Sequence, residues 1–310
     1  MIVTLTINPA IDRNVTADRL VFEDRAYILA RHESPGGRGI NASTVIHSFG
    51  GRTLAIATTG GGGGKRLEEF LACAGYPFRL VEIKNEIRTN LTISDKHGLT
   101  IKLNELGPEM EPAELKRLEK AVERSLGEAT WLMICGSLPP GVPVSFYCKL
   151  IDMARKRGVK TLLDTDGDAL IEGLEAKPTV VAPNQHEAER VLSRALLTRT
   201  HFVEAAQKIR AMGAEGVVLS LGSRGAVGAW GSDRLIEAVP PRVEAVCPIG
   251  AGDAMAAAFT WSMSQKDDFT DAVRWGVAAG TASALLPGVS FASLDQTTQV
   301  YDRVEVRVLK

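Results

Sequence analysis

The chain has 310 residues, 45% of them hydrophobic, which is enough to bury the core of one large domain or of two unequal ones. Its 36 lysines and arginines almost balance 37 aspartates and glutamates, and a formal net charge of -1 gives no reason to expect a nucleic-acid partner. No stretch of eighteen apolar residues predicts a membrane span, no charged-then-apolar leader follows Met1, and the cysteines lack C-x-x-C spacing, so we expect a soluble, cytoplasmic protein with reduced thiols.

The alternating residues Val3 to Ile7 predict a first strand. A turn should follow at 8–12, because Pro9 has no amide to continue a strand ladder. Asp12 in this turn has two interpretations. Its side chain can simply bond its own backbone, or, at the carboxyl end of the first strand of an α/β sheet, it can accept hydrogen bonds from sugar hydroxyls.

Two segments outside the main pattern predict a small separate sheet. Residues 18–35 contain short strand-like pieces with little helical periodicity, and 78–104 contain alternating segments joined by a hairpin turn at 95–98. We interpret them as an antiparallel layer formed by about 11–35 and 86–105, inserted in the larger domain. Such a layer is suited to serve as a lid over a site that must exclude water.

Arg88 and Asn90 stand near the start of the second of these segments. If their side chains face inward, they reach an anionic substrate under the lid. The plainer interpretation of Arg88 is a solvated arginine on an edge strand, and the residue taken alone favours it.

Two glycine runs resemble nucleotide-binding turns. Residues 34–41 open a helix that should end near residue 49, and Gly37-x-Gly39-x-x-Ala42 has the spacing of a dinucleotide-binding turn. No acidic residue follows about twenty positions on, so we exclude NAD. The run Gly60 to Gly64 is not a P-loop, because Arg66 stands where a magnesium-binding Ser or Thr is required, and it is interpreted as a flexible strand-to-helix turn.

From residue 112 onward, amphipathic helices alternate with short apolar strands, which predicts a parallel, doubly wound sheet with helices on both faces. The turns Gly136 to Gly141 and Asp164 to Gly167 each follow a strand and therefore fall at the edge where ligands bind. The predicted helices are 112–126, 143–157 and 201–212, and the predicted strands are 131–135, 160–163, 179–181, 217–220, 227–230 and 235–239.

Asn184 and Glu187 form an N-x-x-E pattern with two interpretations of similar weight. Their oxygens suit a Mg²⁺ ion held through intervening waters, but the same pattern is typical of the first turn of a helix. Ser220 to Gly225 leave a strand with two glycines, which would let a nucleotide approach the backbone closely. This segment can equally be a plain turn between strands.

The segment 246–259 reads as a turn that feeds a helix. Gly250 and Gly252 leave backbone amides free at the helix start, where the helix dipole also favours an anion. Asp253 follows at once and could take a proton from an attacking hydroxyl, which is the minimal equipment for phosphoryl transfer. A glycine-rich connector with a helix-starting aspartate is the alternative, and these residues alone do not decide between the two.

The ordered set of these turns resembles the ribokinase-like PfkB carbohydrate kinases over residues 1 to about 301. Each motif is weak alone, but the order of all of them is specific. Within that family the chain is most similar to the sugar-phosphate branch of phosphofructokinases and tagatose-6-phosphate kinases. The motifs that carry this closer match are Thr6 to Asp12, Pro35 to Asn41, and Arg88 with Asn90.

The resemblance implies a single ribokinase-like domain over 1–310, an ATP- and Mg²⁺-dependent kinase, and a homodimer formed through the lid sheets. It implies a catalytic set of Asp253 as the base with the anion hole of Gly250, Ala251 and Gly252. It implies substrate contacts from Asp12, Gly37 and Asn41 to sugar hydroxyls and from Arg25, Arg38, Arg88, Asn90 and Ser137 to the phosphate already on the sugar. It also implies that Asn184 and Glu187 organise the metal and that Asn184, Ser220, Gly222, Arg224, Gly225 and Thr281 contact ATP.

Three positions depart from the family pattern. Ala182 replaces a lysine before the Pro-Asn pair, and Arg224 would compensate for it at the ATP phosphates. Pro248 replaces a Thr or Ser near the anion hole. Leu286 stands where a polar residue helps to build a potassium site, so the resemblance leaves a need for K⁺ open.

The implied reaction is ATP-dependent phosphorylation of fructose-6-phosphate, fructose-1-phosphate or tagatose-6-phosphate to the bisphosphate. One alternative is a kinase of an unphosphorylated sugar or nucleoside, which would not need arginines under the lid. The other is a non-catalytic sensor of sugar phosphates or nucleotides, which the departures at Ala182 and Pro248 favour.

Overall fold

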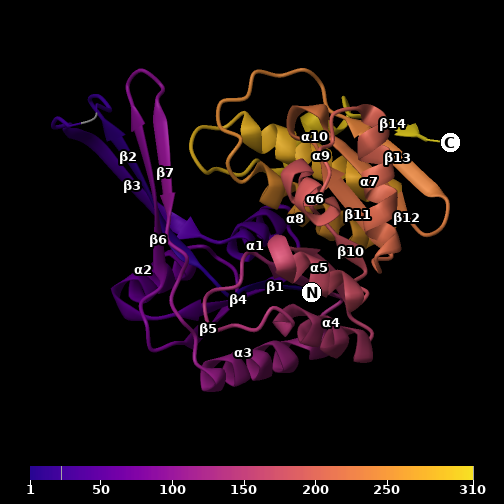
Figure 1. Ribbon diagram of the computed structural model, residues 1–310, viewed down its shortest axis with the longest axis horizontal. Coiled ribbons are helices and arrows are strands. Elements are labelled where there is room, and N and C mark those ends of the chain that lie inside the picture. The colour runs from indigo at the N-terminus through magenta and orange to yellow at the C-terminus, as the bar shows by residue number, and fades with distance from the viewer. Residues whose placement is uncertain (22, 310) are drawn as a thin grey trace.

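The computed structural model describes residues 1–21 and 23–309 and is built on a large sheet with the strand order β14-β13-β12-β11-β10-β9-β8-β1-β4-β5 (Figure 1). The strands from β5 to β11 pair in parallel, and β12, β13 and β14 continue the sheet in antiparallel pairs. They are β1 (Ile2–Thr6), β4 (Thr53–Thr59), β5 (Phe78–Glu82), β8 (Trp131–Cys135), β9 (Lys160–Asp164), β10 (Val180–Val181), β11 (Gly216–Ser220), β12 (Ala226–Trp230), β13 (Arg234–Val239) and β14 (Glu305–Val308).

Alternate side chains of the central strands enter two separate hydrophobic cores. In β8, Leu132 and Ile134 pack on one face, whereas Trp131 and Met133 pack on the other. Both faces are apolar because helices cover both, which is why these strands read as continuous apolar runs. The structure confirms the predicted doubly wound fold.

Helices α2, α3, α4, α5 and α7 pack on one face of the large sheet, and α8, α9 and α10 pack on the other (Figure 1). The helices are α1 (Arg38–Ser48), α2 (Gly61–Ala72), α3 (Pro112–Ser125), α4 (Phe146–Lys156), α5 (Gly167–Glu175), α6 (Gln185–Leu192), α7 (Arg199–Ala211), α8 (Ala251–Lys266), α9 (Phe269–Ala284) and α10 (Leu294–Tyr301), with 3-10 turns at Leu126–Glu128 and Gly222–Arg224. None of these helices combines the length and the hydrophobicity that a membrane crossing requires.

The second sheet has four strands in the order β3-β2-β6-β7 and projects from the end of the large sheet near β4 and β5 (Figure 1). Its strands are β2 (Ala10–Ala17), β3 (Ile28–Gly36), β6 (Arg88–Asp95) and β7 (Thr100–Asn104). The prediction of a purely antiparallel layer was wrong, because β2 and β6 pair in parallel. In the chain, β2 follows β1 and β6 follows β5. Because β1 and β5 run in the same direction in the large sheet, β2 and β6 both enter the small sheet from the same side.

The glycine run at 60–64 connects a strand to a helix as predicted, but it is not a flexible turn, because β4 ends at Thr59 and α2 already begins at Gly61. The amide of Gly63 donates to Glu86 Oε1 (2.8 Å), so a carboxylate caps the positive end of this helix. A Cβ on Gly60 would lie 2.1 Å from the carbonyl oxygen of Asn85. The glycines therefore allow the chain before β6 to pack directly on the start of α2.

Candidate active site

The turn before α8 has the conformation that the sequence predicted for an anion-binding elbow. Gly250 is the N-cap of α8 with φ of +81°, a value that favours glycine. The amides of Gly250 and Gly252 have no acceptor among the described residues, whereas the amide of Ala251 donates to Pro248 O (3.2 Å). Two of the three predicted amides are therefore free for a ligand.

Asp253 lies in the first turn of α8, where its carboxylate accepts a hydrogen bond from Asn41 Nδ2 on α1 (2.7 Å). The side chain is partly accessible, yet the surrounding protein withdraws it from water, and this desolvation raises the pKa of Asp253 to about 7. Asp164 raises this pKa further, while the Asn41 hydrogen bond and Arg38 lower it. A carboxyl group with this pKa can exchange a proton near neutral pH.

Arg38, at the start of α1, contacts two buried carboxylates. Its Nη1 donates to Asp164 Oδ1 (2.6 Å) at the end of β9, and its Nη2 donates to Glu187 Oε1 (3.1 Å) on α6. The two carboxylate side chains are 8% and 2% exposed. Burial raises the pKa of Glu187, and Arg38 opposes that shift. The structure thus gives Arg38 partners other than the predicted sugar phosphate.

Asn184 and Glu187 form a capping box at the start of α6. Asn184 Oδ1 accepts from the amide of Glu187 (2.9 Å), and Glu187 Oε2 accepts from the amide of Asn184 (2.8 Å). With Arg38 on its other oxygen, Glu187 has both carboxylate oxygens engaged. The structure therefore shows the helix-start arrangement of this pattern, and a metal role through intervening waters stays a prediction.

A cluster of polar side chains lies where the small sheet meets the large one. Asp12 Oδ1 accepts from Asn90 Nδ2 (2.8 Å), and desolvation raises the pKa of Asp12. Arg88 donates to the carbonyl oxygens of Asn8 (3.1 Å) and Glu105 (3.0 Å). Asp12 and Arg88 also interact electrostatically, so the predicted residues of both lid segments come together here.

Several buried polar atoms of this cluster have no partner among the described residues. They are Asn8 Oδ1, Ser34 Oγ, Arg88 Nε and Asn90 Oδ1. Because a buried polar group without a partner is costly, their concentration in one place indicates a site for a polar ligand.

The remaining predicted substrate residues lie in different places. Gly37 is the N-cap of α1, and Ser137 Oγ accepts from Asn8 Nδ2 (3.3 Å) beside the polar cluster. Arg25 is exposed in the connection between Ala17 and Ile28, at the end of the β2–β3 pair away from Asp12, and the structure does not bring it to the cluster.

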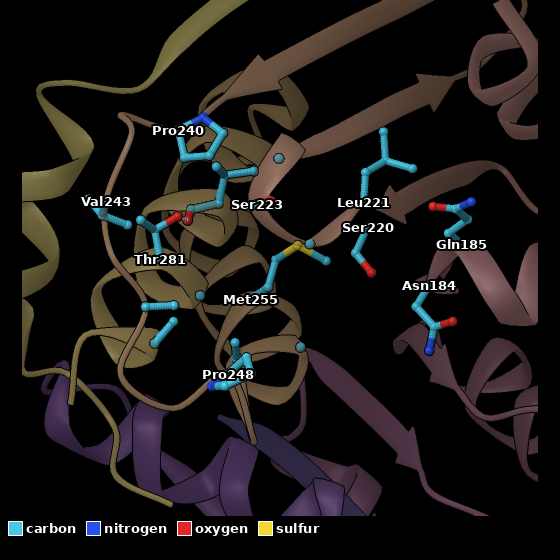
Figure 2. Close-up of a pocket in the computed structure, with 18 of the residues that line it drawn as sticks. Asn184, Gln185, Ser220, Leu221, Ser223, Pro240, Val243, Pro248, Met255 and Thr281 are labelled. Carbon is cyan, nitrogen blue, oxygen red and sulfur yellow. Dashed lines mark hydrogen bonds between the residues drawn. The ribbon is translucent and has the colours of Figure 1, made fainter. Parts of the chain in front are cut away.

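A cavity of about 970 Å³ opens beside the start of α8. In Figure 2, Asn184, Gln185 and Ser220 lie on one side of it, Pro240, Val243 and Thr281 lie on the other, and Met255 lies between. The predicted nucleotide residues that line the cavity are Asn184, Ser220, Gly222, Gly225 and Thr281, joined by Ala251 and Gly252 of the elbow.

Arg224 does not line this cavity among the described residues. Its Nη2 donates to Gln185 Oε1, and its guanidinium lies 4.6 Å from the centre of the Phe202 ring. The expected compensation for Ala182 by Arg224 is therefore not seen in this conformation.

Sequence reasoning missed several residues of these sites. Asp164, the last residue of β9, was expected at the ligand-binding edge but was given no role, and Asn8, which follows β1, was not proposed as a site residue; their place at strand ends of the parallel sheet is the signal that could have found both. The coil from Pro240 to Ala245, which forms one wall of the cavity, carries no such signal.

Comparisons with known proteins agree with this arrangement. The model of the pfkB family of carbohydrate kinases matches residues 3–296. The chain is 35% identical over 303 residues to ATP-dependent 6-phosphofructokinase isozyme 2 of Escherichia coli, covering 97% of both chains. It is 28% identical to 1-phosphofructokinase of Borreliella burgdorferi, covering 92% of both. A crystal structure of phosphofructokinase-2 from Escherichia coli in complex with potassium superposes with a TM-score of 0.91 at 34% identity, covering 97% of this chain and 98% of that one. The chain belongs to the pfkB family of carbohydrate kinases.

Proposed function

We propose that this sugar-phosphate kinase transfers the γ-phosphoryl group of ATP to a hydroxyl of a ketohexose phosphate: fructose-6-phosphate, fructose-1-phosphate or tagatose-6-phosphate. The relatives named above act on fructose phosphates, and a tagatose-6-phosphate kinase of Staphylococcus epidermidis is 26% identical over 309 residues. The observation that carries the proposal is the position of the α8 elbow. Ala251 and Gly252 line the large cavity, while Asp253 is close enough to Asp12 for that charge to raise its pKa.

In this proposal the elbow is where the two substrates meet. The amides of Gly250 and Gly252 would stabilise the charge on the moving phosphoryl group, and Asp253 would accept the proton of the attacking hydroxyl. Asn41 holds the Asp253 carboxylate through the 2.7 Å hydrogen bond. Phosphoryl transfer asks little covalent chemistry of the protein, so holding donor and acceptor in line provides most of the catalysis.

The polar cluster would bind the sugar phosphate. Asp12, Gly37 and Asn41 face the sugar hydroxyls in this assignment, and Arg88, Asn90 and Ser137 face the phosphate. The unpartnered Arg88 Nε and Asn90 Oδ1 support it, because a bound sugar phosphate offers both acceptors and donors. The small sheet would act as the lid that removes water from this site.

ATP would occupy the 970 Å³ cavity, with its terminal phosphate at Gly252. The residues do not form a dedicated magnesium site: no group of three or more His, Cys, Asp or Glu in residues 1–21 and 23–309 is placed to hold a metal, and both oxygens of Glu187 are engaged. This fits a Mg²⁺ that arrives on the nucleotide phosphates and keeps its waters, with no direct ligand from Asn184 or Glu187. Turnover measured with K⁺ and with tetramethylammonium decides whether potassium is needed.

We also propose a homodimer formed through the small sheets. Leu99, Leu103 and Ile101 on the edge strand β7 and its turn are 54%, 55% and 37% exposed. Leu29 on the opposite edge strand β3 is 60% exposed. Apolar side chains gathered on such a sheet favour burial against a second copy.

The test is a panel of acceptors with the purified wild-type chain, ATP and Mg²⁺, with ADP formation as the readout. We expect one of the three ketohexose phosphates to give a kcat/KM at least about 100-fold above that of free fructose or adenosine, because the charge-assisted contact of Arg88 and the contacts of Asn90 and Ser137 to the phosphate would be lost with the unphosphorylated acceptors. Preferred turnover of free fructose or adenosine would replace the proposal with a kinase of unphosphorylated acceptors. Binding of ATP and sugar phosphate without turnover would replace it with a sensor.

A further inference from the structure

The cavity assigned to ATP has an unusual distribution of charge. Among the described residues that line it, Arg242 is the one with a permanent positive charge, and none is acidic. His186 also lines the cavity, but its side chain is 82% exposed and contacts Glu189 (3.2 Å between Nδ1 and Oε2). A nucleotide triphosphate carries several negative charges, so a cationic side chain in addition to the helix amides would strengthen its binding in this cavity.

Arg242 lies on the coil that joins β13 to α8, a segment without helix or strand that ends at the Gly250 elbow. Pro240, Val243 and Pro248 of this coil also line the cavity, so the coil runs along it like a strap (Figure 2). The amides of Val246 and Cys247 fasten the strap to Ala284 O (2.8 and 3.0 Å). The part that carries Arg242 has no such hydrogen bond among the described residues.

The guanidinium of Arg242 is available for a ligand. It makes no hydrogen bond or ion pair of 4.0 Å or less with any residue in 1–21 and 23–309, and the side chain is exposed at the cavity wall. Arg224, the cation that the sequence suggested for this task, is held by Gln185 and Phe202 outside the lining. Arg242 on the strap is therefore a cationic side chain without a protein partner among the described residues, and no other described residue that lines the cavity provides a permanent positive charge.

We propose that Arg242 binds the phosphates of ATP that are not transferred, reaching them from the strap. This inference rests on the proposed ATP site and adds a residue that fixes nucleotide affinity. The planar guanidinium can donate two parallel hydrogen bonds to phosphate oxygens, which a lysine cannot do.

Titration calorimetry with ATP, ADP, AMP and adenosine tests the proposal in wild type, Arg242→Ala and Arg242→Lys. Arg234→Ala is the matched control, since Arg234 is an exposed arginine at the other end of β13. We expect Arg242→Ala to weaken ATP and ADP about tenfold, the usual effect of losing one charge-assisted contact, and to change adenosine less than twofold. Arg242→Lys should fall between, and Arg234→Ala should match wild type.

Wild-type affinity of Arg242→Ala for ATP, or an equal loss for adenosine and ATP, would overturn the proposal. Arg242 is exposed on a coil, so the variants should fold, and circular dichroism checks this. Failure of the proposed function is recognised separately, because it would appear as an absence of ATP binding or turnover in the wild-type protein.

Discussion

The pKa of the Asp253 carboxyl group is set by its surroundings. A carboxylate in water has a pKa near 3.8 and would be a weak base, but withdrawal from water and the charge of Asp164 raise the pKa of Asp253 to about 7. A base poised near the working pH combines a sizeable ionised fraction with a real affinity for the proton. The same desolvation that raises the pKa of Asp253 also makes its ionised form less stable than it would be in water.

The first prediction is the pH dependence of the reaction. Because only the ionised carboxylate accepts a proton, kcat should rise with pH through about 7 and fall about tenfold per unit well below it. The measurement is kcat at saturating substrates from pH 5.5 to 9. The control is Asn41→Ala, which should move the midpoint upward, because the lost hydrogen bond lowers the pKa of Asp253 in the native protein. A kcat independent of pH between 5.5 and 8 would contradict the assignment.

The second prediction concerns Arg88 and the phosphate already on the sugar. Arg88→Ala should raise KM for the sugar phosphate about 10- to 100-fold, because the charge-assisted contact between the guanidinium and the phosphate on the sugar is lost. KM for ATP should stay nearly unchanged, because Arg88 does not contact the nucleotide in this proposal. Steady-state kinetics with each substrate varied in turn gives both values. Equal changes in the two KM values would count against a role confined to the sugar phosphate.

Single residues were only partly predictable from the sequence. The position of Asp253 after two glycines indicated its environment, and the structure adds the neighbour Asp164 that raises its pKa. The N-x-x-E pattern of Asn184 and Glu187 could not be resolved, since a capping box and a metal site use the same residue types. The partners of Arg38 depend on residues more than 120 positions away, which no local pattern reveals.

At the scale of elements, Arg38 connects three parts of the fold. It begins α1 and reaches Asp164 at the end of β9 and Glu187 in the first turn of α6. Through α1 it is also linked to Asn41, which holds Asp253. Helix α6 borders the large cavity through Gln185, so one guanidinium positions the elements on both sides of the elbow.

The third prediction is that Arg38→Met lowers the free energy of unfolding by roughly 3 kcal/mol, because two buried carboxylates lose their cation. The variant should also shift the pH midpoint of kcat upward, because Arg38 lowers the pKa of Asp253. Urea denaturation and the pH profile measure the two effects. Arg124→Met, at an exposed position of α3, is the control and should change neither. Wild-type stability and an unchanged midpoint in Arg38→Met would refute this role.

Elements with a strong pattern were predicted within a few residues. Strands such as β8 are apolar throughout, and the hairpin of β6 and β7 has a good turn sequence. The start of α2 was not predicted, because its first residues are glycines, which local propensity places outside helices. The packing of the chain before β6 and the carboxylate of Glu86 override that propensity.

At the scale of the whole molecule, the large sheet and the small sheet contribute different parts of the candidate site. The large sheet is covered on both faces and places strand ends, the elbow and the cavity along one edge. The small sheet leaves apolar side chains exposed and contributes Asp12, Arg88 and Asn90 at its base.

The fourth prediction is that Leu103→Asp breaks the proposed dimer. Leu103 is 55% exposed on β7, and a buried unpaired carboxylate would oppose association. Size-exclusion chromatography with light scattering should show a dimer for wild type and a monomer for Leu103→Asp. Lys102→Asp is the control, because neighbouring residues of a strand face opposite sides of the sheet. A monomeric wild-type protein, or a dimeric Leu103→Asp, would contradict the interface.

The overall architecture was the most predictable level. The alternation of strands and helices after residue 112 predicted the doubly wound sheet, and the two irregular segments predicted the second one. The parallel pairing of β2 with β6 was not predictable, since it depends on how both strands leave the large sheet. Contacts between distant segments, such as Asn41 with Asp253, follow from this architecture rather than from any local motif.

The most direct test of the central claim is the kinetics of Asp253→Asn together with its affinity for ATP. The substitution keeps the size of the side chain and removes its ability to take a proton, so kcat should fall about 10²- to 10⁴-fold while the Kd for ATP stays within about twofold. A kcat close to that of wild type in a correctly folded variant would contradict the account.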